Sequence, residues 1–566
     1  MSTYKFPDKN TEVSTQYKDS SALFNQLLNT RGLKSAEEIE SFLNPDYDTQ
    51  LHAPELMNDM SAACERVEAA MANGERIAIF SDYDCDGIPG AVVLHDFFKA
   101  IKYDNFQNYI PHRHFEGFGL SNAALDSLKK DGVTLAITID CGTSNVSEVA
   151  YAKELGIDII VTDHHEPEEV LPAAVAIVNP KLGGYPFTEL CGSGTVFKFV
   201  QAMLNRNDYE LPKGKEKWWL DMVGVATIAD MVPLQGENRV FAHYGLQVLR
   251  KSRRPGLQQL LKKAKADQRY LTEDDIGFTI GPRINAASRM DTPEDAFFML
   301  AETDLVKAGE RVEHLEKLNT ERKTMVALMT KDLHKRMKTL EEIPSVIVTG
   351  NPDWRPSLVG LAANKLAEEY NRPVFLWGKD GNDVYKGSCR SGGGASVVKL
   401  MQAAKDSFLE QGGHHGAGGF SVKDEHIFTF GEELVKAMND LGDEAIVNEE
   451  ISIDAEISLS DINQLLLKQL KQLSPFGVGN PKPLFAFVNV SPVSVELFGK
   501  TKEHTKMLFD SENGKVEAIT FFQTPADYTF VPAEGVPCTM VGYVEQSFFM
   551  GRMQTRVRVL DIVPSK

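Results

Sequence analysis

The chain has 566 residues and a formal net charge of -20 at pH 7. At roughly 100 to 200 residues per domain, this length predicts about three or four domains, and 42% apolar with 25% charged residues is typical of a globular rather than a disordered or fibrous protein. The acidity excludes a generally basic nucleic-acid-binding surface, because affinity for phosphates comes from Lys and Arg side chains that displace counterions.

The predicted elements change character along the chain. Residues 1–74 read as short polar helices and form a helical lead-in. Over residues 75–303, short apolar runs alternate with helical segments, which predicts a parallel sheet covered by helices on both faces. A long connecting helix is expected over 304–340, because Leu, Val and Met recur there at helical spacing and proline is absent.

The remaining chain predicts two further domains. Residues 341–446 form a second α/β region with glycine-rich segments, and residues 447–566 consist of short alternating strands with turn residues between them, which indicates a small β-barrel. The fold class is therefore α/β: a parallel-sheet catalytic domain, a connecting helix, a smaller α/β domain and a C-terminal barrel. Tethered domains without a coiled-coil seam favour a monomer.

The sequence also bears on location and on the thiols. The opening MSTYKFPDKN is polar, and no apolar run approaches the roughly 18 residues that a membrane helix needs. We therefore expect a cytoplasmic protein that does not bind membranes. The six cysteines are far apart and form no CxxC pair of the kind that zinc sites and redox motifs use, so reduced structural thiols are expected.

Acidic residues and histidines follow the apolar runs of the first α/β region. They are Asp82 and Asp84 after IAIF, Asp140 after LAITI, the triplet Asp163-His164-His165 after IDIIVT, and Asp230 after MVGVATIA. The carboxyl ends of parallel strands line one crevice, so these side chains should converge. A single Asp after a strand is more often a helix N-cap. The recurrence at four segment ends instead favours a hydrolytic centre with two Mn²⁺ or Mg²⁺ ions, since such ions activate water and neutralise a phosphoryl group.

An EF-hand calcium loop is excluded, although Asp82-x-Asp84-x-Asp86-Gly87 matches its first positions. That loop needs a Glu at its twelfth position and a helix before it. Here Val93 stands at the twelfth position and the apolar run IAIF precedes the loop.

Several motifs resemble those of a known family. SDYDCDG, TIDCGTSN and VTDHHEP, with the later Asp230, resemble the successive motifs of the DHH phosphoesterases, which are named after the Asp-His-His triplet. Five further segments are similar to motifs of the RecJ branch, the single-strand-specific 5′ to 3′ DNA exonucleases: PHRHFEGFGL, GPRINAASRMD, GSCRSGG, GGHHGAGGF and PFGVGNPKPLF. The resemblance extends from about residue 31 to the C-terminus.

The resemblance assigns functions to the predicted domains. It implies a DHH catalytic domain over 75–303, a DHH-associated domain over 341–446 and an OB-like single-strand-binding domain over 447–566. The implied activity is release of 5′-mononucleotides from single-stranded DNA by two-metal hydrolysis, in DNA repair and recombination. The implied partners beyond single-stranded DNA are single-strand-binding protein, a RecQ-type helicase and mismatch-repair proteins.

The resemblance also implies a set of ligands for two cations. Asp82 would bind one ion, Asp84, His164 and Asp230 the other, and Asp140 would bridge the two. Ala78 stands where related pyrophosphatases carry a further histidine ligand, so one of the two sites is more open. Asp84, Asp140 and His165 would be the catalytic residues. His165 would polarise the scissile phosphate, or alternatively would orient a neighbouring ligand.

A 5′-end exonuclease needs a pocket for a terminal phosphate. The resemblance implies that Arg113, Ser388 and Arg390 bind this phosphate, and that Asn285 and Arg289 face the substrate. His414, beside Gly412 and Gly413, is a further candidate substrate-binding residue. Arginine suits the role because its planar fork pairs with two phosphate oxygens. The glycines beside Ser388 and His414 either present N–H groups to a phosphate or simply form tight turns. An Asn and an Arg in a turn can likewise be purely structural.

Two further patterns have both a functional and a structural interpretation. Residues 250–266 carry seven basic residues and no acid, which suits either a phosphate-backbone track or a solvated helix face. In the C-terminal domain, Phe521, Phe522, Phe548 and Phe549 are candidate base-stacking platforms, or else core residues.

Two alternative functions stay open from the sequence. A small-substrate DHH phosphodiesterase acting on oligonucleotides or cyclic dinucleotides would use the same metals, and deletion of residues 447–566 should leave its activity largely intact. A catalytically inactive DHH scaffold that binds DNA is the other alternative. The intact acidic residues and His164 argue against the scaffold, because a decayed site should have lost ligands.

Overall fold

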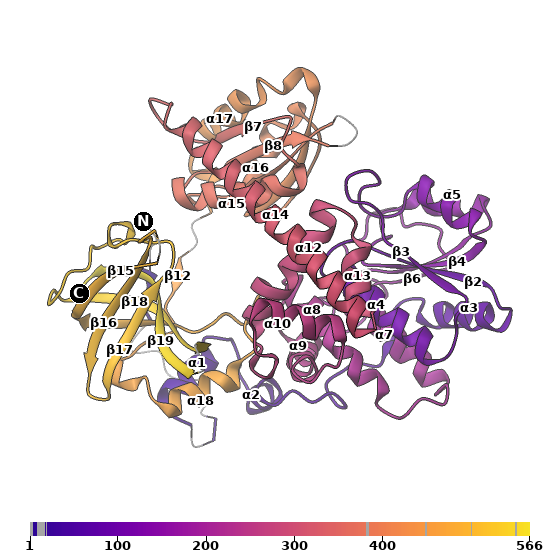
Figure 1. The fold of residues 1–566 in the computed structure, drawn as a ribbon, viewed down its shortest axis with the longest axis horizontal. Coiled ribbons are helices and arrows are strands. Elements are labelled where there is room, and N and C mark those ends of the chain that lie inside the picture. The colour runs from indigo at the N-terminus through magenta and orange to yellow at the C-terminus, as the bar shows by residue number, and fades with distance from the viewer. Residues whose placement is uncertain are drawn as a thin grey trace. The chain divides into compact units, whose positions relative to one another are not determined.

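The computed structural model describes residues 4–7, 17–18, 20–380, 384–447, 450–499, 501–549 and 552–565, and the chain divides into two units. The first unit comprises Met1–His52, Met231–Leu246 and Glu450–Lys566, and the second unit comprises Ala53–Asp230 and Gln247–Glu449. Figure 1 labels the elements of both units along the chain.

The second unit begins with a parallel five-stranded sheet in the order β3-β2-β4-β5-β6. Its strands are β2 (Arg76–Ser81), β3 (Phe106–Tyr109), β4 (Val133–Ile139), β5 (Asp158–Thr162) and β6 (Ala176–Val178). The central strands are apolar on both faces because helices cover both, as is usual for parallel sheets.

Alternate residues of these strands pack against different helices. Ala78, Phe80 and Val161 share one cluster with residues of α5 (Asn122–Lys130) and α6 (Val146–Glu154). On the opposite face, Ile139 lies against Gly90 of α4 (Gly87–Ala100), where a Cβ atom would come within 2.7 Å of it. Helices α3 (Met60–Ala72) and α7 (Gly192–Arg206) complete this layered arrangement.

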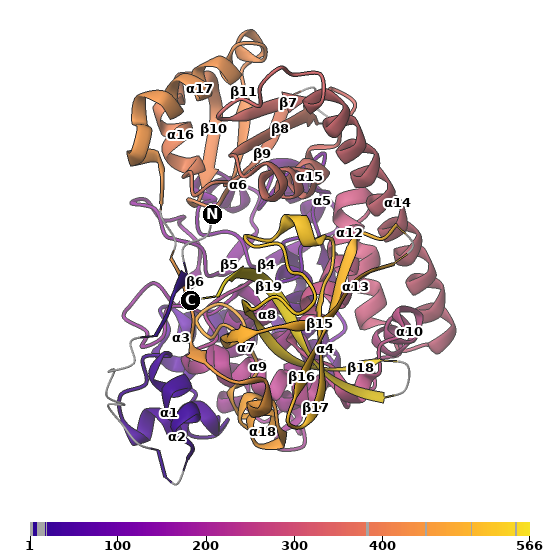
Figure 2. The same ribbon diagram turned by 90° about the vertical axis from the view of Figure 1, so that its left-hand side faces the viewer.

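A helical region follows and leads into one long helix. It contains α8 (Leu220–Ala229), α10 (Pro255–Ala264), α11 (Glu273–Asp275), a π-helical turn (Ile276–Ile280), α12 (Gly281–Met290) and α13 (Glu294–Ala301). Helix α9 (Gly236–Leu249) stands between α8 and α10 in the sequence, and its residues up to Leu246 belong to the first unit. Helix α14 (Leu305–Met337) then runs unbroken for 33 residues, and Asp304 caps it by accepting the N–H groups of Val306 and Lys307 (Figure 2). The expected connecting helix is thus present.

A second, mixed sheet follows α14 in the same unit, in the order β10-β11-β9-β8-β7. Its strands are β7 (Ile347–Gly350), β8 (Val374–Lys379), β9 (Tyr385–Arg390), β10 (Phe408–Gly413) and β11 (Ala417–Val422), and its helices are α15 (Pro356–Tyr370), α16 (Val397–Ala403) and α17 (Phe430–Leu441). Packing accounts for several of its glycines: a Cβ at Gly387 would lie 2.2 Å from the Phe420 ring, and one at Gly392 2.2 Å from the Arg372 carbonyl oxygen.

The first unit contains a seven-stranded sheet in the order β13-β14-β18-β19-β17-β16-β15. Its strands are β13 (Ala455–Glu456), β14 (Leu484–Val490), β15 (Pro492–Phe498), β16 (His504–Ser511), β17 (Gly514–Thr520), β18 (Cys538–Phe549) and β19 (Arg552–Pro564), and a short pair joins β1 (Tyr4–Lys5) to β12 (Ile451–Ser452). Its helices are α1 (Ala22–Asn29), α2 (Ala36–Leu43) and α18 (Gln464–Leu473).

One hydrophobic core joins the two ends of the chain within the first unit. Phe24 and Leu27 of α1 and Ile39 of α2 pack in the same cluster as Leu466 of α18 and Phe485 of β14. Helices α1 and α2 therefore bury their apolar faces against the C-terminal region, although more than 400 residues separate them in sequence.

Two smaller observations concern the thiols and the helices. All six cysteines are buried and unbridged. Among the helices of the described residues, none combines the length and the apolar character required to span a bilayer.

Candidate metal centre

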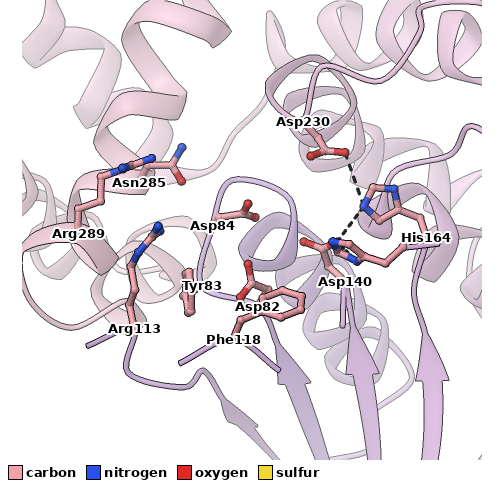
Figure 3. Close-up of a pocket in the computed structure, with 11 residues that line it drawn as sticks. Asp82, Tyr83, Asp84, Arg113, Phe118, Asp140, His164, Asp230, Asn285 and Arg289 are labelled. Carbon is pink, nitrogen blue, oxygen red and sulfur yellow. Dashed lines mark ion pairs between the residues drawn. The ribbon is translucent and has the colours of Figure 1, made fainter. Parts of the chain in front are cut away.

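The carboxyl ends of β2, β4 and β5 open into a pocket of about 280 Å³ in the second unit. Its lining residues are Asp82, Tyr83, Asp84, Arg113, Phe118, Asp140, His164, His165, Asp230, Asn285 and Arg289 (Figure 3). All five predicted metal ligands thus meet with His165 and with three of the predicted substrate-binding residues. Tyr83 and Phe118 also line the pocket, although neither was predicted from the sequence as a site residue.

The loop between β2 and α4 holds its acidic residues through backbone hydrogen bonds. Asp84 Oδ1 accepts the N–H groups of the N-cap residue Asp86 at 2.8 Å and of Gly87 at 3.2 Å, so Asp84 holds the loop that leads into α4 while also lining the pocket. Gly87 is required here, because an added Cβ would lie 2.5 Å from the Asp82 carbonyl oxygen.

Asp86 is a site residue that the sequence analysis left without a role. Its buried carboxylate accepts the N–H groups of Gly192 at 2.6 Å and Ser193 at 2.7 Å, at the start of α7. Ser193 Oγ donates in turn to the Asp86 carbonyl oxygen at 2.6 Å. Asp86 therefore ties α4 to α7, with its Oδ2 atom 3.8 Å from His164 Nε2. The signal in the sequence was the third acid of SDYDCDG, directly before the first residue of a helix.

Asp140 has a strained backbone at the end of β4. Its φ angle is 62°, a left-handed value that residues other than glycine seldom adopt and that is concentrated at functional sites. The carboxylate Oδ1 lies 3.2 Å from His164 Nε2 (Figure 3). Gly192 permits this placement, because a Cβ there would lie 2.5 Å from Asp140 Cβ.

Asp163, the first residue of the triplet, orients the second histidine. Its Oδ1 lies 2.7 Å from His165 Nδ1, and its Oδ2 accepts the Thr143 N–H at 3.0 Å. Burial alone would raise the pKa of Asp163, but the hydrogen bond and charge of His165 hold that pKa below its usual range. His165 is also flanked by Phe118, whose ring stands edge-on with centroids 5.4 Å apart. Asp163 therefore fixes the ring that faces the pocket.

The donor atoms of the pocket form three overlapping groups, each with all atoms within 4.8 Å: Asp82, Asp84 and Asp140; Asp86, His164 and Asp230; and Asp140, His164 and His165. The second group contains Asp86 where the sequence-based assignment placed Asp84. Asp86 already accepts two backbone N–H groups, so which carboxylate serves each ion stays a prediction.

The electrostatics of these groups fit divalent cations. Burial, and next the charge of Asp84, raise the pKa of Asp82. Burial, followed by Asp86 and Asp84, raises the pKa of Asp230 to about 9. The buried atoms Asp82 Oδ1 and Asp140 Oδ1 accept no hydrogen bond. Carboxylates that repel one another, with two buried oxygens that accept no hydrogen bond, require positive charge. Carboxylates together with imidazole suit Mn²⁺ or Mg²⁺.

Guanidinium groups occupy the opposite side of the pocket (Figure 3). Arg113 stacks on Tyr83, with its Cζ atom 4.8 Å from the ring centroid. Arg289 is held by the Ser357 carbonyl oxygen at 2.6 Å, and burial, with Arg113 nearby, lowers its pKa to about 10. Asn285 lies one helical turn before Arg289 on α12, and its buried Oδ1 accepts no hydrogen bond. Unpaired donors and acceptors of this kind suit a polar ligand.

Three predicted substrate-binding residues belong to the second sheet and are not among the lining residues of this pocket. Ser388 and Arg390 on β9 face Gly360 of α15, where a Cβ would lie 3.1 Å from an Arg390 nitrogen. The positive charge of Arg390 nevertheless contributes to the lowered pKa of Arg289. His414 is exposed in the turn between β10 and β11, where its N–H donates to the Ala417 carbonyl oxygen.

The basic run 250–266 is partly used for internal contacts. Arg254 pairs with Asp221 of α8 at 2.9 Å and with Asp96 of α4 at 2.7 Å. Arg250 donates to the Leu271 carbonyl oxygen, and Lys263 pairs with Glu313 of α14. Because Arg250, Arg254 and Lys263 make these contacts within the protein, they are not free to form a continuous phosphate-binding track along the run.

The candidate aromatic platforms lie in the first unit. Phe522 is 77% exposed and Phe521 is 36% exposed, so neither is a buried core residue. Arg558 lies 4.3 Å from the centroid of the Phe521 ring. Phe548 and Phe549 have side chains outside the described part of the structure.

Comparison with known proteins places the chain in a family. Three family models match it: "DHH family, N-terminal domain" over residues 76–227, "DHHA1 domain" over 344–447 and "RecJ OB domain" over 453–561. The single-stranded-DNA-specific exonuclease RecJ of Bacillus subtilis (strain 168) is 33% identical over 569 residues, which cover 99% of this chain and 70% of the relative. The protein of the same name from Haemophilus influenzae is 31% identical over 521 residues, covering 88% of this chain and 89% of the relative.

A solved structure is similar as well. RecJ from Thermus thermophilus, in complex with Mn²⁺, superposes with a TM-score of 0.79 at 26% identity, covering 96% of this chain and 76% of that chain. The family models and this structure confirm the predicted fold class. The chain belongs to the RecJ family of single-stranded-DNA-specific exonucleases within the DHH phosphoesterases.

Proposed function

We propose that this protein is a metal-dependent exonuclease that removes 5′-mononucleotides from the 5′ end of single-stranded DNA. The observation that carries the proposal is the pocket in which buried carboxylates and His164 face Arg113, Asn285 and Arg289. The relatives described above are named single-stranded-DNA-specific exonucleases, and the Thermus protein was solved with Mn²⁺.

The residues of the pocket have different roles in the proposed hydrolysis. Asp82 and Asp140 would hold one Mn²⁺ or Mg²⁺ ion, and Asp84, Asp140, His164 and Asp230 would hold the second. When bound, such ions would neutralise the charge of the scissile phosphate and lower the pKa of the attacking water. Burial would lower the pKa of His165, but the hydrogen bond and charge of Asp163 at Nδ1 raise it. The protonated ring would donate a hydrogen bond from Nε2 to a phosphate oxygen.

The guanidinium groups account for binding of DNA by an acidic protein. Arg113 and Arg390 both lower the pKa of Arg289, so the three charges act on one region of the second unit. Arginine binds phosphate oxygens through paired N–H groups. We assign Arg113, Ser388 and Arg390 to the terminal 5′-phosphate, and His414, Asn285 and Arg289 to the binding of the substrate strand. This local positive region offsets the repulsion expected from a net charge of -20.

The wider biological assignments follow from family membership and belong to the same proposal. They are a role in DNA repair and recombination, cytoplasmic location, a monomeric state, and contacts with single-strand-binding protein, a RecQ-type helicase and mismatch-repair proteins. The domain limits 1–74, 75–303, 304–340, 341–446 and 447–566 are proposed functional divisions of the chain. Exposed Phe521 and Phe522 suit base stacking by the C-terminal domain.

Product analysis of 5′-labelled DNA tests the proposal. With Mn²⁺ or Mg²⁺, we expect labelled mononucleotide from single strands and none from duplex DNA. Asp140→Ala should abolish release, because Asp140 belongs to two of the three donor groups. Asp424→Ala, at an exposed carboxylate of the same unit, is the matched control and should keep full activity.

Two outcomes would contradict the proposal. Tight binding of DNA without release of nucleotides would support an inactive scaffold. Turnover of dinucleotides alone would support a small-substrate phosphodiesterase.

A further inference from the structure

A five-residue π-helical turn, Ile276–Ile280, leads into α12 in the second unit. The Gly281 N–H donates to the Ile276 carbonyl oxygen, so this turn holds one residue more than a turn of α-helix. Turns of this kind are frequent at functional sites. Ile276 and Ile280 are fully buried, whereas the Phe278 side chain between them is 80% exposed. The turn is therefore anchored by its two isoleucines and presents an aromatic ring to solvent.

The start of α12 lies beside two segments that supply acids of the metal pocket. A Cβ at Gly281 would lie 3.7 Å from Cys85 Sγ and 3.9 Å from Ala229 Cβ, which is ordinary contact distance. Cys85 belongs to the acidic loop after β2, and Ala229 directly precedes the last acid of the pocket. Phe278 stands three residues before Gly281, so its ring lies within about one helical turn of this contact.

Phe278 shares one face of the helix with two residues of the pocket. Residues three or four apart lie on the same side of a helix. Four residues follow that spacing from the π-helical turn into α12: Phe278, Pro282, Asn285 and Arg289. None of the four is buried, and the last two line the metal pocket (Figure 3). The exposed face of the helix therefore runs from the pocket to the aromatic ring.

This face has a direction that fits the polarity of the proposed reaction. Arg289 lies at one end, where the charges of Arg113 and Arg390 act on it, and we place the terminal 5′-phosphate in that region. Phe278 lies seven residues before Asn285, which is about 10 Å along the helix axis. Stacked nucleotides of one strand are roughly 3.4 Å apart. About two or three nucleotides therefore reach from the pocket to Phe278.

The Phe278 ring lacks the partners that other exposed phenylalanines of the second unit have. The ring centroids of Phe115 and His112 are 4.6 Å apart, and Arg311 lies 5.0 Å from the centroid of the Phe298 ring. Among the residues that the structure describes, no aromatic ring or cation stacks on Phe278. A nucleobase suits this surface, because every base has a π face and stacks on aromatic side chains whatever the sequence.

We propose that Phe278 is a base-stacking site for the substrate strand, about two or three nucleotides to the 3′ side of the nucleotide that is removed. The ring keeps the strand in line with the pocket without reading its sequence and without touching the reacting phosphate. The inference rests on the proposed exonuclease function. It adds a contact that depends on bases, whereas the arginines and the acidic centre act on phosphates.

Binding of single-stranded DNA to the full-length protein tests this inference. The probe is a 5′-phosphorylated strand of about 8 nucleotides, with a fluorophore at its 3′ end and a phosphorothioate at its first linkage to slow hydrolysis. Fluorescence anisotropy in Mg²⁺ gives the Kd. Phe278→Ala should raise the Kd about tenfold, as expected for the loss of one base–aromatic stack. Phe278→Trp should keep the affinity, and Phe278→Leu, which keeps apolar bulk without the ring, should lose most of it.

Strands with one abasic position locate the stacked base. In the wild type, removal of the base from the third or fourth nucleotide should weaken binding as much as Phe278→Ala does. Phe278→Ala should bind that abasic strand and the intact strand equally well, because both partners of one contact are then absent. Losses that add at every position would overturn the inference.

A matched control and a parallel assay complete the test. Phe428→Ala removes a ring that is 87% exposed in the same unit, in the turn before α17, and should leave the Kd unchanged. Wild-type affinity in Phe278→Ala would likewise overturn the inference. Release of mononucleotide from an unmodified strand is followed in parallel. If the wild type releases none while Phe278→Ala still weakens binding, the proposed exonuclease function fails and the stacking site stands.

Discussion

At the scale of single residues, the acids of the site combine a structural role with a chemical one. Asp84 accepts backbone N–H groups of the loop that leads into α4 and still lines the pocket, so a structural and a chemical role do not exclude each other here. The Asp86 carboxylate accepts backbone N–H groups, and the Asp163 carboxylate forms a hydrogen bond with His165. The acids of the site therefore fall into two groups: some line the pocket, and others hold the surrounding backbone and His165 in place.

Arg113 allows a test of phosphate recognition at this scale. Arg113→Lys keeps the charge but loses the planar fork and the stacking on Tyr83. We expect the KM for 5′-phosphorylated single-stranded DNA to rise roughly tenfold, equivalent to about 1.4 kcal/mol, with little change for 5′-hydroxyl DNA. Steady-state kinetics on both substrates measure this. Arg76→Lys is the control, because Arg76 is exposed and donates to Gln107. Equal losses on the two substrates would remove Arg113 from the terminal-phosphate site.

At the scale of elements, helices of the second unit are joined by charged groups as well as by apolar packing. Arg254 precedes α10 and bridges Asp221 of α8 and Asp96 of α4. Ser252 Oγ also donates to Asp221 at 2.7 Å. The side chains of Arg254 and Asp221 are 14% and 4% exposed, so water screens their attraction only weakly.

Neighbouring arginines provide a comparison of stability and DNA binding. Arg254→Met leaves Asp221 buried without its cation, and the free energy of unfolding should fall by about 3–5 kcal/mol. Arg253→Met, at the exposed preceding residue, should change it by less than about 0.5 kcal/mol. Thermal and urea unfolding of both variants measure the difference. Comparable stability of the two variants would show that the bridge contributes little.

A lower salt dependence of DNA binding in Arg253→Met would support a phosphate track along the exposed residues of this run.

At the scale of the whole molecule, the first unit is assembled from three separate stretches of chain. Phe24, Leu27 and Ile39 are at most 2% exposed because the C-terminal region covers them. Deletion of residues 447–566 is therefore a poor way to separate a small-substrate enzyme from an exonuclease, since it also uncovers α1 and α2.

Truncation tests this assembly. A protein of residues 1–449 should self-associate and bind a hydrophobic dye, because each uncovered large apolar side chain costs roughly 1.5–3 kcal/mol. A protein of residues 53–449 lacks the uncovered helices and should associate less. Light scattering and dye fluorescence compare the two with the full-length chain. If residues 1–449 remain monomeric and bind no dye, the shared core is not needed to cover α1 and α2.

Much of the fold and the composition of the site followed from the sequence alone. Apolar runs in β2, β4 and β5 predicted a parallel sheet, and the geometry of such sheets brings the residues that follow them together. Uninterrupted helical spacing predicted α14. Family resemblance singled out Asp82, Asp140, His164 and Asp230, which line one pocket. These features depend on local periodicity and on short motifs, which a sequence displays directly.

Only the tertiary structure decided which distant segments share a core and which acids face the pocket. Helices α1 and α2 pack on the C-terminal region, and Leu234 N–H donates to the Val478 carbonyl oxygen. No short sequence pattern predicts these contacts, because each joins segments that lie hundreds of residues apart. Asp86 cannot be told apart in the sequence from the other acids of SDYDCDG, but in the fold its carboxylate accepts an N–H group at the start of α7. Arg254 resembles a surface charge in sequence and is an interior bridge in the fold. Burial and partner choice are properties of the assembled chain, and they separate residues of identical type.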